Sequence, residues 1–246
     1  ATLFTGCTTK DVTPVRAESA EEVINLFNEY NKANDIENMV SLYSDVYLDS
    51  VGYSSGTVVK MLEANRKNAQ ITKSETESIE AIDENIEKAV VNMAIMEEGK
   101  EVPYTYTYAM IKEDDGWAVS PDGVIECINV EAPEIVSGKL NIYLSKIIKL
   151  VDGYILRADI SNNSSEAYSF GKEGNLCEVV VETTEGQYKT PMLEEVKLDK
   201  KVKTYFMARA DELKGEVKKV TITNVYDIED DVIKEDSMRD IVIYEK

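Results

Sequence analysis

Tyrosines and aspartates alternate in one short stretch of the chain, where their side chains could support acid-base chemistry. Tyr43, Asp45, Tyr47 and Asp49 follow one another at every second position. A buried carboxylate has a raised pKa and can act as a general base, and a tyrosine hydroxyl beside it can stabilise an enolate. Both residue types are abundant in this chain, and no position matches an enzyme motif. The sequence therefore assigns no catalytic residue.

A second group of aromatic residues lies in a stretch with the two-residue period of a strand. Three tyrosines share one face of it, namely Tyr104, Tyr106 and Tyr108. Thr105 and Thr107 occupy the other face, so either the tyrosines or the threonines point into the domain.

Trp117 favours the tyrosines as the inward face. A large indole should point to the core, and a two-residue turn at Asp115 and Gly116 would pair Asp114 with Trp117, on the tyrosine face. A bulge that paired Glu113 with Trp117 would reverse this. Six residues form the candidate lining of an interior pocket: Tyr43, Tyr47, Tyr104, Tyr106, Tyr108 and Trp117. Core packing with hydroxyls at the rim is favoured over a ligand pocket.

Histidine is absent from the chain, which narrows the possible chemistry. Its absence removes the usual general base, the Ser-His and Cys-His nucleophile pairs, and most zinc and iron sites. The acidic run at 227–231 raises the possibility of calcium, but it lacks the glycine turn and the distant glutamate of an EF-hand loop. We interpret the run as a solvated loop, and we predict no metal and no cofactor.

The stretch Leu-Phe-Thr-Gly-Cys at residues 3–7 resembles a bacterial lipobox, in which the cysteine receives a diacylglyceryl group. We favour this interpretation over an ordinary chain start. Cys7 would then be the mature N-terminus, and residues 8–17 would form a flexible spacer behind it. Two acyl chains suffice for stable anchoring. The expected location is the outer face of the bacterial cytoplasmic membrane.

The other two cysteines bear on disulfide bonding, and the net charge bears on the possible partners. Cys127 and Cys177 could form a disulfide, but two buried free thiols are favoured. The formal net charge is −20, of which −16 falls on residues 18–132. Such a field repels nucleic acid and disfavours self-association, so we expect no nucleic-acid partner and a monomer.

The sequence pattern of residues 18–131 predicts an α+β domain. Ser19 and Glu22 form a capping box that opens one helix, a second helix starts after Asp35, and a third runs from about 58 to 70 with Thr57 as its cap. Strands are predicted at 71–82, 88–96, 102–112, 117–119 and 124–130. This order, which ends in a hairpin whose second strand begins Asp-Gly-Trp at 115–117, resembles the nuclear transport factor two-like fold and its bacterial lipoprotein branch. The resemblance implies three helices on a curved, cone-shaped sheet.

Residues 135–246 follow a proline-containing linker and predict an all-β domain. Strands are expected at 139–150, 153–162, 176–183, 187–191, 202–210, 217–226 and 240–245. Seven short strands at this spacing are typical of a β-sandwich. The segment 155–164, a strand that ends in Asn and Ser, resembles the second strand of immunoglobulin-like domains of bacterial lipoproteins.

Together these features predict a lipid-anchored, extracytoplasmic binding or envelope accessory protein that is not an enzyme. Its partner would be a small ligand, a peptide or an envelope protein, besides the membrane reached through Cys7. Two alternatives remain open. One is a cone-fold enzyme of the isomerase or cyclase type that uses Asp and Tyr, and the other is a structural spacer or protein-interaction module.

Overall fold

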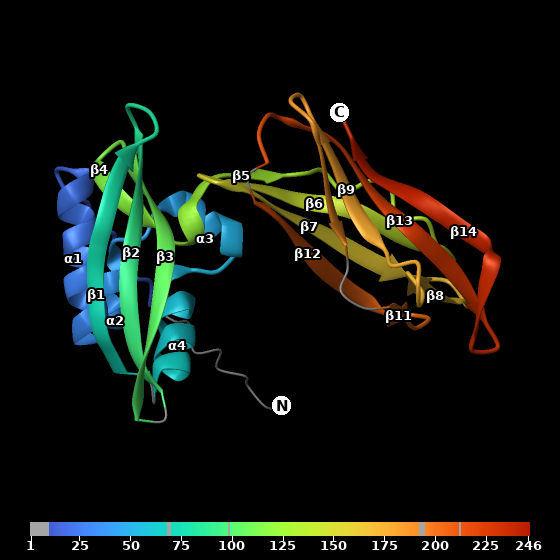
Figure 1. Cartoon of the computed structure of the whole chain (residues 1–246), viewed down its shortest axis with the longest axis horizontal. Helices are drawn as coiled ribbons and strands as arrows, with labels where there is room; N and C mark the ends of the chain where they lie inside the picture. Colours follow the sequence, from blue (N-terminus) through green and yellow to red (C-terminus); the bar gives the residue numbers. More distant parts are fainter. Residues whose placement is uncertain (1–9, 68–69, 98, 192–194, 212) are drawn as a thin grey trace, which may run out of the picture. The chain divides into compact units, whose positions relative to one another are not determined.

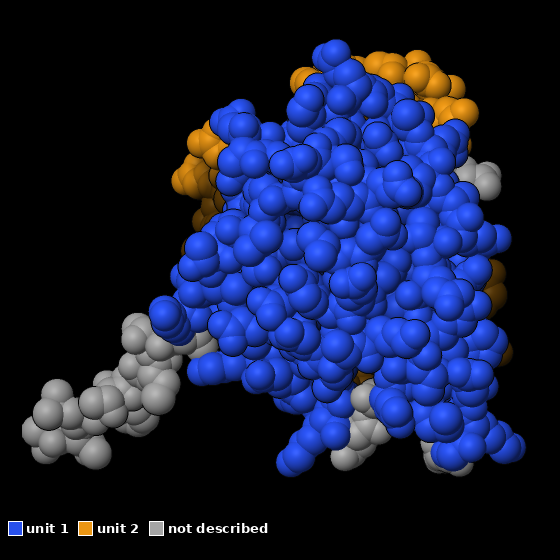
Figure 2. Space-filling model, turned by 90° about the vertical axis from the view of Figure 1, so that its left-hand side faces the viewer, with its two compact units in different colours: residues 1–127 blue, residues 128–246 orange. Residues whose placement is uncertain are grey.

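The computed structural model describes residues 10–67, 70–97, 99–191, 195–211 and 213–246 (Figure 1). The chain divides into two compact units, Ala1–Cys127 and Ile128–Lys246, which Figure 2 shows in different colours. The predicted lipidation site, Cys7, lies outside the described residues. No helix in the described part of the chain is long and apolar enough to cross a membrane.

The first unit combines helices with one antiparallel sheet. Its helices are α1 (Ala20–Ala33), α2 (Ile36–Ser41), α3 (Asp45–Val51) and α4 (Ser55–Arg66). The sheet has the order β1-β2-β3-β4, with β1 (Gln70–Ala81), β2 (Ile86–Glu97), β3 (Lys100–Glu113) and β4 (Gly116–Ser120). Helix α1 packs against β1, β3 and β4 (Figure 1). The predicted α+β architecture is confirmed at this level.

The helix boundaries follow from their caps. The Ser19 hydroxyl accepts a hydrogen bond from the Glu22 N–H at 3.1 Å, as the predicted capping box requires. The third predicted helix begins earlier than expected, because Ser54 and not Thr57 is the N-cap of α4. The sequence also predicts three helices where four are described. Helix α3 was missed, and it begins at its own N-cap, Ser44, whose hydroxyl accepts from the Tyr47 N–H.

The predicted spacer at residues 8–17 is wrong over its second half. The Val12 N–H donates to Ser55 Oγ at 2.9 Å, and Ala17 exchanges main-chain hydrogen bonds with Trp117 on β4. The side chain of Arg16 is only 5% exposed and forms an ion pair with Glu113. These contacts make residues 12–17 part of the first unit.

The second unit contains two antiparallel sheets. One has the order β12-β7-β6-β5, and the other has the order β10-β9-β13-β8-β11 with β14 beside β13. The strands are β5 (Val124–Asn129), β6 (Leu140–Leu150), β7 (Gly153–Asn162), β8 (Ala167–Phe170), β9 (Glu178–Thr183), β10 (Gln187–Pro191), β11 (Val196–Leu198), β12 (Lys203–Asp211), β13 (Val217–Glu229) and β14 (Val232–Glu245). The short helix η1 (Pro121–Gly123) and residues 124–127 of β5 belong to the first unit, so the chain passes into the second unit within β5.

The two sheets share one hydrophobic core. Leu144 and Leu156 come from the first sheet, and Val179, Val220 and Ile222 come from the second; all five are almost fully buried. Alternating apolar residues on both sheets require a common buried layer of this kind. The coarse prediction of an all-β second domain is confirmed.

Three strand predictions need correction. Strand β5 was expected in the sheet of the α+β domain, but it pairs with β6 in the sheet β12-β7-β6-β5 and not with β1 to β4. Strands β8 and β11 were missed, because four and three residues are too short to show a period. The acidic run was expected to form a loop, but strand β13 continues to Glu229, and only Asp230 and Asp231 form the hairpin turn, both with positive φ.

Candidate functional site

The predicted tyrosines form one continuous row of rings in the first unit. Along β3, the ring centroids of Tyr104 and Tyr106 are 6.1 Å apart, and those of Tyr106 and Tyr108 are 6.4 Å apart. The row continues from Tyr108 to Phe27 of α1 at 4.8 Å. Phe27 lies 6.4 Å from Tyr43, which completes the path from the sheet to the helices.

Tyr47 of α3 ends the row. Its ring meets that of Tyr43 edge-on at a centroid distance of 5.3 Å, a favourable geometry for aromatic pairs. The structure therefore brings all five predicted tyrosines together. Phe27 is the linking residue that the prediction of the site missed.

Trp117 lies on the face that the sequence predicted, but through a different turn. The turn consists of Asp114 and Asp115, so Glu113 pairs with Gly116 and Lys112 pairs with Trp117. Lys112 shares the tyrosine face because it lies an even number of residues from Tyr108. Trp117 accordingly packs against the core of the first unit.

Four tyrosine hydroxyls of the row, those of Tyr43, Tyr47, Tyr104 and Tyr108, have a raised pKa. Burial raises the pKa of Tyr43 and of Tyr108, and it raises the pKa of Tyr47 to about 12. At the outer end of the row, the Tyr104 hydroxyl donates to Glu97 at 2.8 Å, and this bond raises the pKa of Tyr104. At neutral pH the row therefore offers apolar rings and hydroxyl donors, and no phenolate.

The aspartates nearest the row in sequence do not enter it. Asp45 and Asp49 are both exposed, and Asp45 lies 3.5 Å from the guanidinium of Arg16. The burial that would make either carboxylate a general base is therefore missing. The acidic residue whose charge further raises the pKa of Tyr47 is Asp122, an exposed residue of η1 with φ of 57°. Sequence reasoning missed it because η1 is remote in the chain.

A chain of buried and half-buried polar side chains joins α1 and α4 to the sheet. Arg66 donates to Asn31 Oδ1 at 2.7 Å, and Asn31 Nδ2 donates to Ser74 Oγ at 3.0 Å. Ser74 donates to Asn28 Oδ1 at 2.8 Å, and Asn28 Nδ2 donates to Thr76 Oγ1 at 2.9 Å. Because these groups satisfy one another, the network fixes the position of α1 on β1.

The acidic run does not form a metal centre in the described part of the chain, where no cluster of His, Cys, Asp and Glu suits a metal ion. Asp227 pairs with Arg239 at 2.8 Å, and Glu229 pairs with Lys234 at 2.7 Å. Cys177 is a free, buried thiol, so the disulfide that we weighed is not formed. Burial raises the pKa of this thiol to about 12, so it is unreactive at neutral pH.

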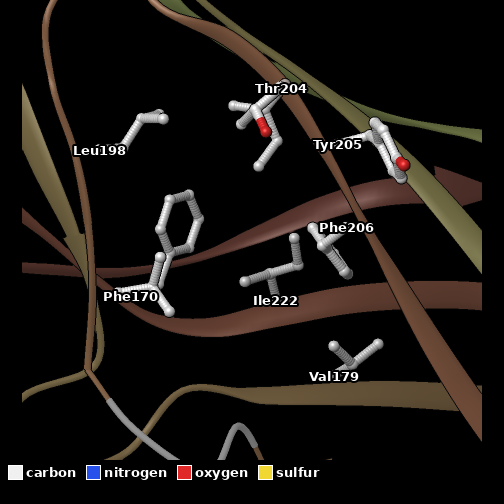
Figure 3. A pocket seen from close by; sticks show the side chains of 9 residues that line it. Phe170, Val179, Leu198, Thr204, Tyr205, Phe206 and Ile222 are labelled. Atoms are coloured by element: carbon white, nitrogen blue, oxygen red, sulfur yellow. The ribbon is translucent and has the colours of Figure 1, made fainter.

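The second unit contains an apolar pocket between its two sheets, with a volume of about 110 Å³. Strands β7 to β9 and β11 to β13 line it with Ile160, Phe170, Val179, Val196, Leu198, Thr204, Tyr205, Phe206 and Ile222. In Figure 3, Leu198 and Phe170 lie on one side and Tyr205 and Phe206 on the other, with Ile222 between them. Sequence reasoning missed this pocket.

The floor of the pocket is buried and its rim is exposed. Phe170 and Ile222 are 3% and 1% exposed, whereas Val196 is 36% and Tyr205 is 55% exposed. The Arg157 guanidinium lies 4.3 Å from the centroid of the Tyr205 ring, a cation–π contact that holds the ring in place. Among the lining residues that the structure describes, Thr204 and Tyr205 are the polar ones and none forms an acid-base pair, so the pocket can bind apolar groups.

One buried asparagine fixes the turns beside the pocket. Asn162 is fully buried, and its Nδ2 donates to the carbonyls of Glu166 and Asp199 at 2.8 and 2.9 Å. Its main-chain N–H donates to the Val202 carbonyl, and its Oδ1 accepts from the Ser164 hydroxyl at 2.7 Å. Because every polar group of this side chain is used, the pocket is bordered by a pre-formed frame.

The fold and the pocket define an α+β unit followed by an all-β unit with an apolar cavity. No family model matches the chain. No curated protein matches it either. Among solved structures, it is similar to an NTF-2-like protein of unknown function from Shewanella oneidensis MR-1, at 11% identity and a TM-score of 0.34. The match covers 41% of this chain and 90% of that chain.

Proposed function

We propose that this chain is a non-catalytic binding protein whose ligand enters the apolar pocket of the second unit. The pocket carries the proposal, because its lining is apolar and pre-formed and its rim is exposed. Pockets with these properties are the usual sites of small-ligand or side-chain binding. The described lining residues include no carboxylate, amine or thiol, and such a lining supports binding.

An apolar probe tests this proposal. A dry, apolar cavity of roughly 150 Å³ binds benzene. Benzene added to the full chain should shift the NMR methyl signals of Ile160, Val179 and Ile222. The variant Val196→Trp should block the entrance and abolish these shifts, whereas Val242→Trp, at an exposed position of β14, should leave them unchanged. Unshifted methyl signals in the wild-type chain would refute the proposal.

The location belongs to the same proposal. The lipobox-like sequence that ends at Cys7 supports a lipid anchor at the outer face of the cytoplasmic membrane. The motif ends at Cys7, and the contacts of the first unit begin at Val12, only a few residues later. The lipid anchor would therefore lie close to the first unit. Mass spectrometry of the native protein should find a diacylated Cys7 as the first residue. A mature chain without lipid there would remove the anchor.

The finer fold assignment is also proposed. A cone-shaped, nuclear transport factor two-like first unit is supported by helices α1 to α4 followed by a four-stranded antiparallel sheet. An immunoglobulin-like second unit is supported by two antiparallel sheets around one core.

A structural spacer is the second candidate function, and the aromatic row favours it for the first unit. Tyr43 and Tyr108 are each only 6% exposed and belong to the core, with Phe27 between them. In this role the first unit would position the binding unit and take up no ligand itself.

A further inference from the structure

The size of the pocket limits what it can take. A volume of about 110 Å³ is comparable to the roughly 150 Å³ of a cavity that holds benzene, but well below the roughly 300–1,000 Å³ of sites for drug-sized ligands. A long acyl chain or a cofactor therefore does not fit. One leucine-sized or phenylalanine-sized side chain does, presented by a larger molecule that remains outside.

The segment that leads from β11 to β12 beside the pocket carries net positive charge in an acidic chain. Leu198 and Thr204 both line the pocket, so the turn between them, residues 199–203, borders it. Residues 195–204 contain four lysines and two acidic residues, in a chain of net charge −20. Lys200 and Lys203 are exposed, and neither forms an ion pair with any residue that the structure describes. The rim therefore attracts carboxylates next to the group that enters the pocket.

The lysine turn is held in place before any ligand binds. The Asp199 and Val202 carbonyls accept hydrogen bonds from Asn162, at 2.9 Å each, and Lys201 Nζ donates to the Asn163 carbonyl at 2.8 Å. A rim that is already ordered loses little conformational entropy on binding.

Exposed residues on the outer face of β12, a strand that lines the pocket, are of the types that dominate protein interfaces. Tyr205 and Met207 on β12 are 55% and 54% exposed, and Arg157 stacks on Tyr205. Tyrosine, methionine and arginine are enriched where one protein docks on another. Because Phe206 and Ala208 face the core, Tyr205 and Met207 point to the outer face of the sheet, on its edge strand β12. A protein segment that crosses this edge to place one residue in the pocket would contact them.

From these observations we infer that the pocket binds one apolar side chain of an acidic segment of a partner protein. This inference rests on the proposed binding function and names its ligand class. The apolar side chain fills the space between Phe170 and Phe206, and the flanking carboxylates face Lys200 and Lys203.

Blocked peptides test the inference on the full chain. The probe is Ac-Glu-Glu-Leu-Glu-Glu-NH2, and its affinity and the methyl shifts of Ile160, Val179 and Ile222 are measured by NMR. This peptide should shift those signals. The peptide with Ala in place of Leu should bind roughly tenfold or more weakly, since it leaves the pocket unfilled. The peptide with lysines in place of the glutamates should also bind more weakly.

Matched variants locate the effect. Val196→Trp should abolish peptide binding, and Val242→Trp should retain it. Lys203→Glu should weaken binding of the acidic peptide several-fold, whereas Lys214→Glu, at an exposed lysine away from the lining residues, should not.

Four results would overturn the inference. One is equal affinity for the Leu and Ala peptides. Another is a shift of the pocket methyl signals by vesicles of anionic lipid and not by the peptide. The third is a shift by benzene without any shift by the Leu peptide, which refutes the ligand class while the proposed binding function stands. The fourth is the absence of any shift of the pocket methyl signals by benzene or by the Leu peptide, which refutes both the ligand class and the proposed binding function.

Discussion

The side-chain amide of Asn162 donates a hydrogen bond to the main-chain carbonyl of Asp199 at 2.9 Å, and so joins the end of β7 to the turn between β11 and β12. Asn162 lies on one sheet of the second unit, and the turn leads from the other sheet. The bond therefore ties the two sheets together where the apolar pocket opens. The shape of the pocket depends on this residue although Asn162 does not line it.

Replacement of Asn162 by alanine should destabilise the second unit by about 2–4 kcal/mol, because the buried Asn162 side chain donates to the carbonyls of Glu166 and Asp199 and accepts from the buried Ser164 hydroxyl. Urea unfolding followed by circular dichroism measures the loss. Asn163→Ala is the matched control, since none of the described hydrogen bonds uses the side-chain amide of Asn163. Equal stability of the two variants would contradict the role given to Asn162.

The network in the first unit predicts a similar loss at Asn31. Asn31→Leu should lower the free energy of unfolding by about 2–4 kcal/mol, because Arg66 loses the acceptor that holds it at 2.7 Å. Fluorescence of Trp117, the only tryptophan, reports the unfolding of this unit. Asn65→Leu, on the exposed side of α4, should change stability little. A small effect at both sites would show that the network does not hold α1.

Arg16 tests whether residues before α1 belong to the folded unit. Its guanidinium is nearly buried and donates to Glu113 at 2.6 Å, with Asp45 and Asp115 at 3.5 Å. Arg16→Met should reduce the free energy of unfolding by about 2–4 kcal/mol, because the partly buried Glu113 carboxylate loses its partner. Lys10→Met serves as the control in the same urea titration. A flexible spacer, as the sequence alone predicts, would make the two variants indistinguishable.

Stability at alkaline pH should depend on Tyr47. The folded chain holds the pKa of this tyrosine at about 12, against an ordinary value of 10 in the unfolded chain. Between pH 10 and 12 the unfolded chain releases a proton that the folded chain keeps. The contribution of Tyr47 to the free energy of unfolding is therefore constant below pH 10 and decreases as the pH rises above 10. The slope from this group is at most about 1.4 kcal/mol per pH unit.

Tyr47→Phe removes that contribution, so stability should fall less steeply between pH 10 and 12 than in the wild type. Urea unfolding at several alkaline pH values, followed by Trp117 fluorescence, measures the slope. Tyr53→Phe, at a tyrosine that is 49% exposed, is the control. An unchanged slope in Tyr47→Phe would mean that burial does not hold this hydroxyl protonated.

Local sequence patterns predicted much of the first unit. The alternation of Tyr104, Tyr106 and Tyr108 with threonine defines both the strand and its inward face, and Ser19 defines the start of α1. Pairing between remote strands is different, because the alternation at 124–130 indicates a strand without naming its partner. The sequence therefore identified β5 as a strand but placed it in the wrong sheet.

The pocket lay beyond sequence reasoning for the same physical reason. Phe170 and Leu198 lie on β8 and β11, strands too short to show a period, and Phe206 comes from the opposite sheet. A cavity is what remains when such side chains fail to fill the space between two sheets. Its existence depends on packing geometry that composition and period do not encode.

Xenon tests the central claim, an accessible apolar binding pocket in the second unit, most directly. Crystals of the chain pressurised with xenon should show one anomalous scattering peak among Phe170, Leu198, Phe206 and Ile222, because dry apolar cavities bind this gas. The same experiment on Val196→Trp should show a weaker peak or none. The account would be contradicted if a wild-type crystal bound no xenon at this position, or if an ordered water occupied it.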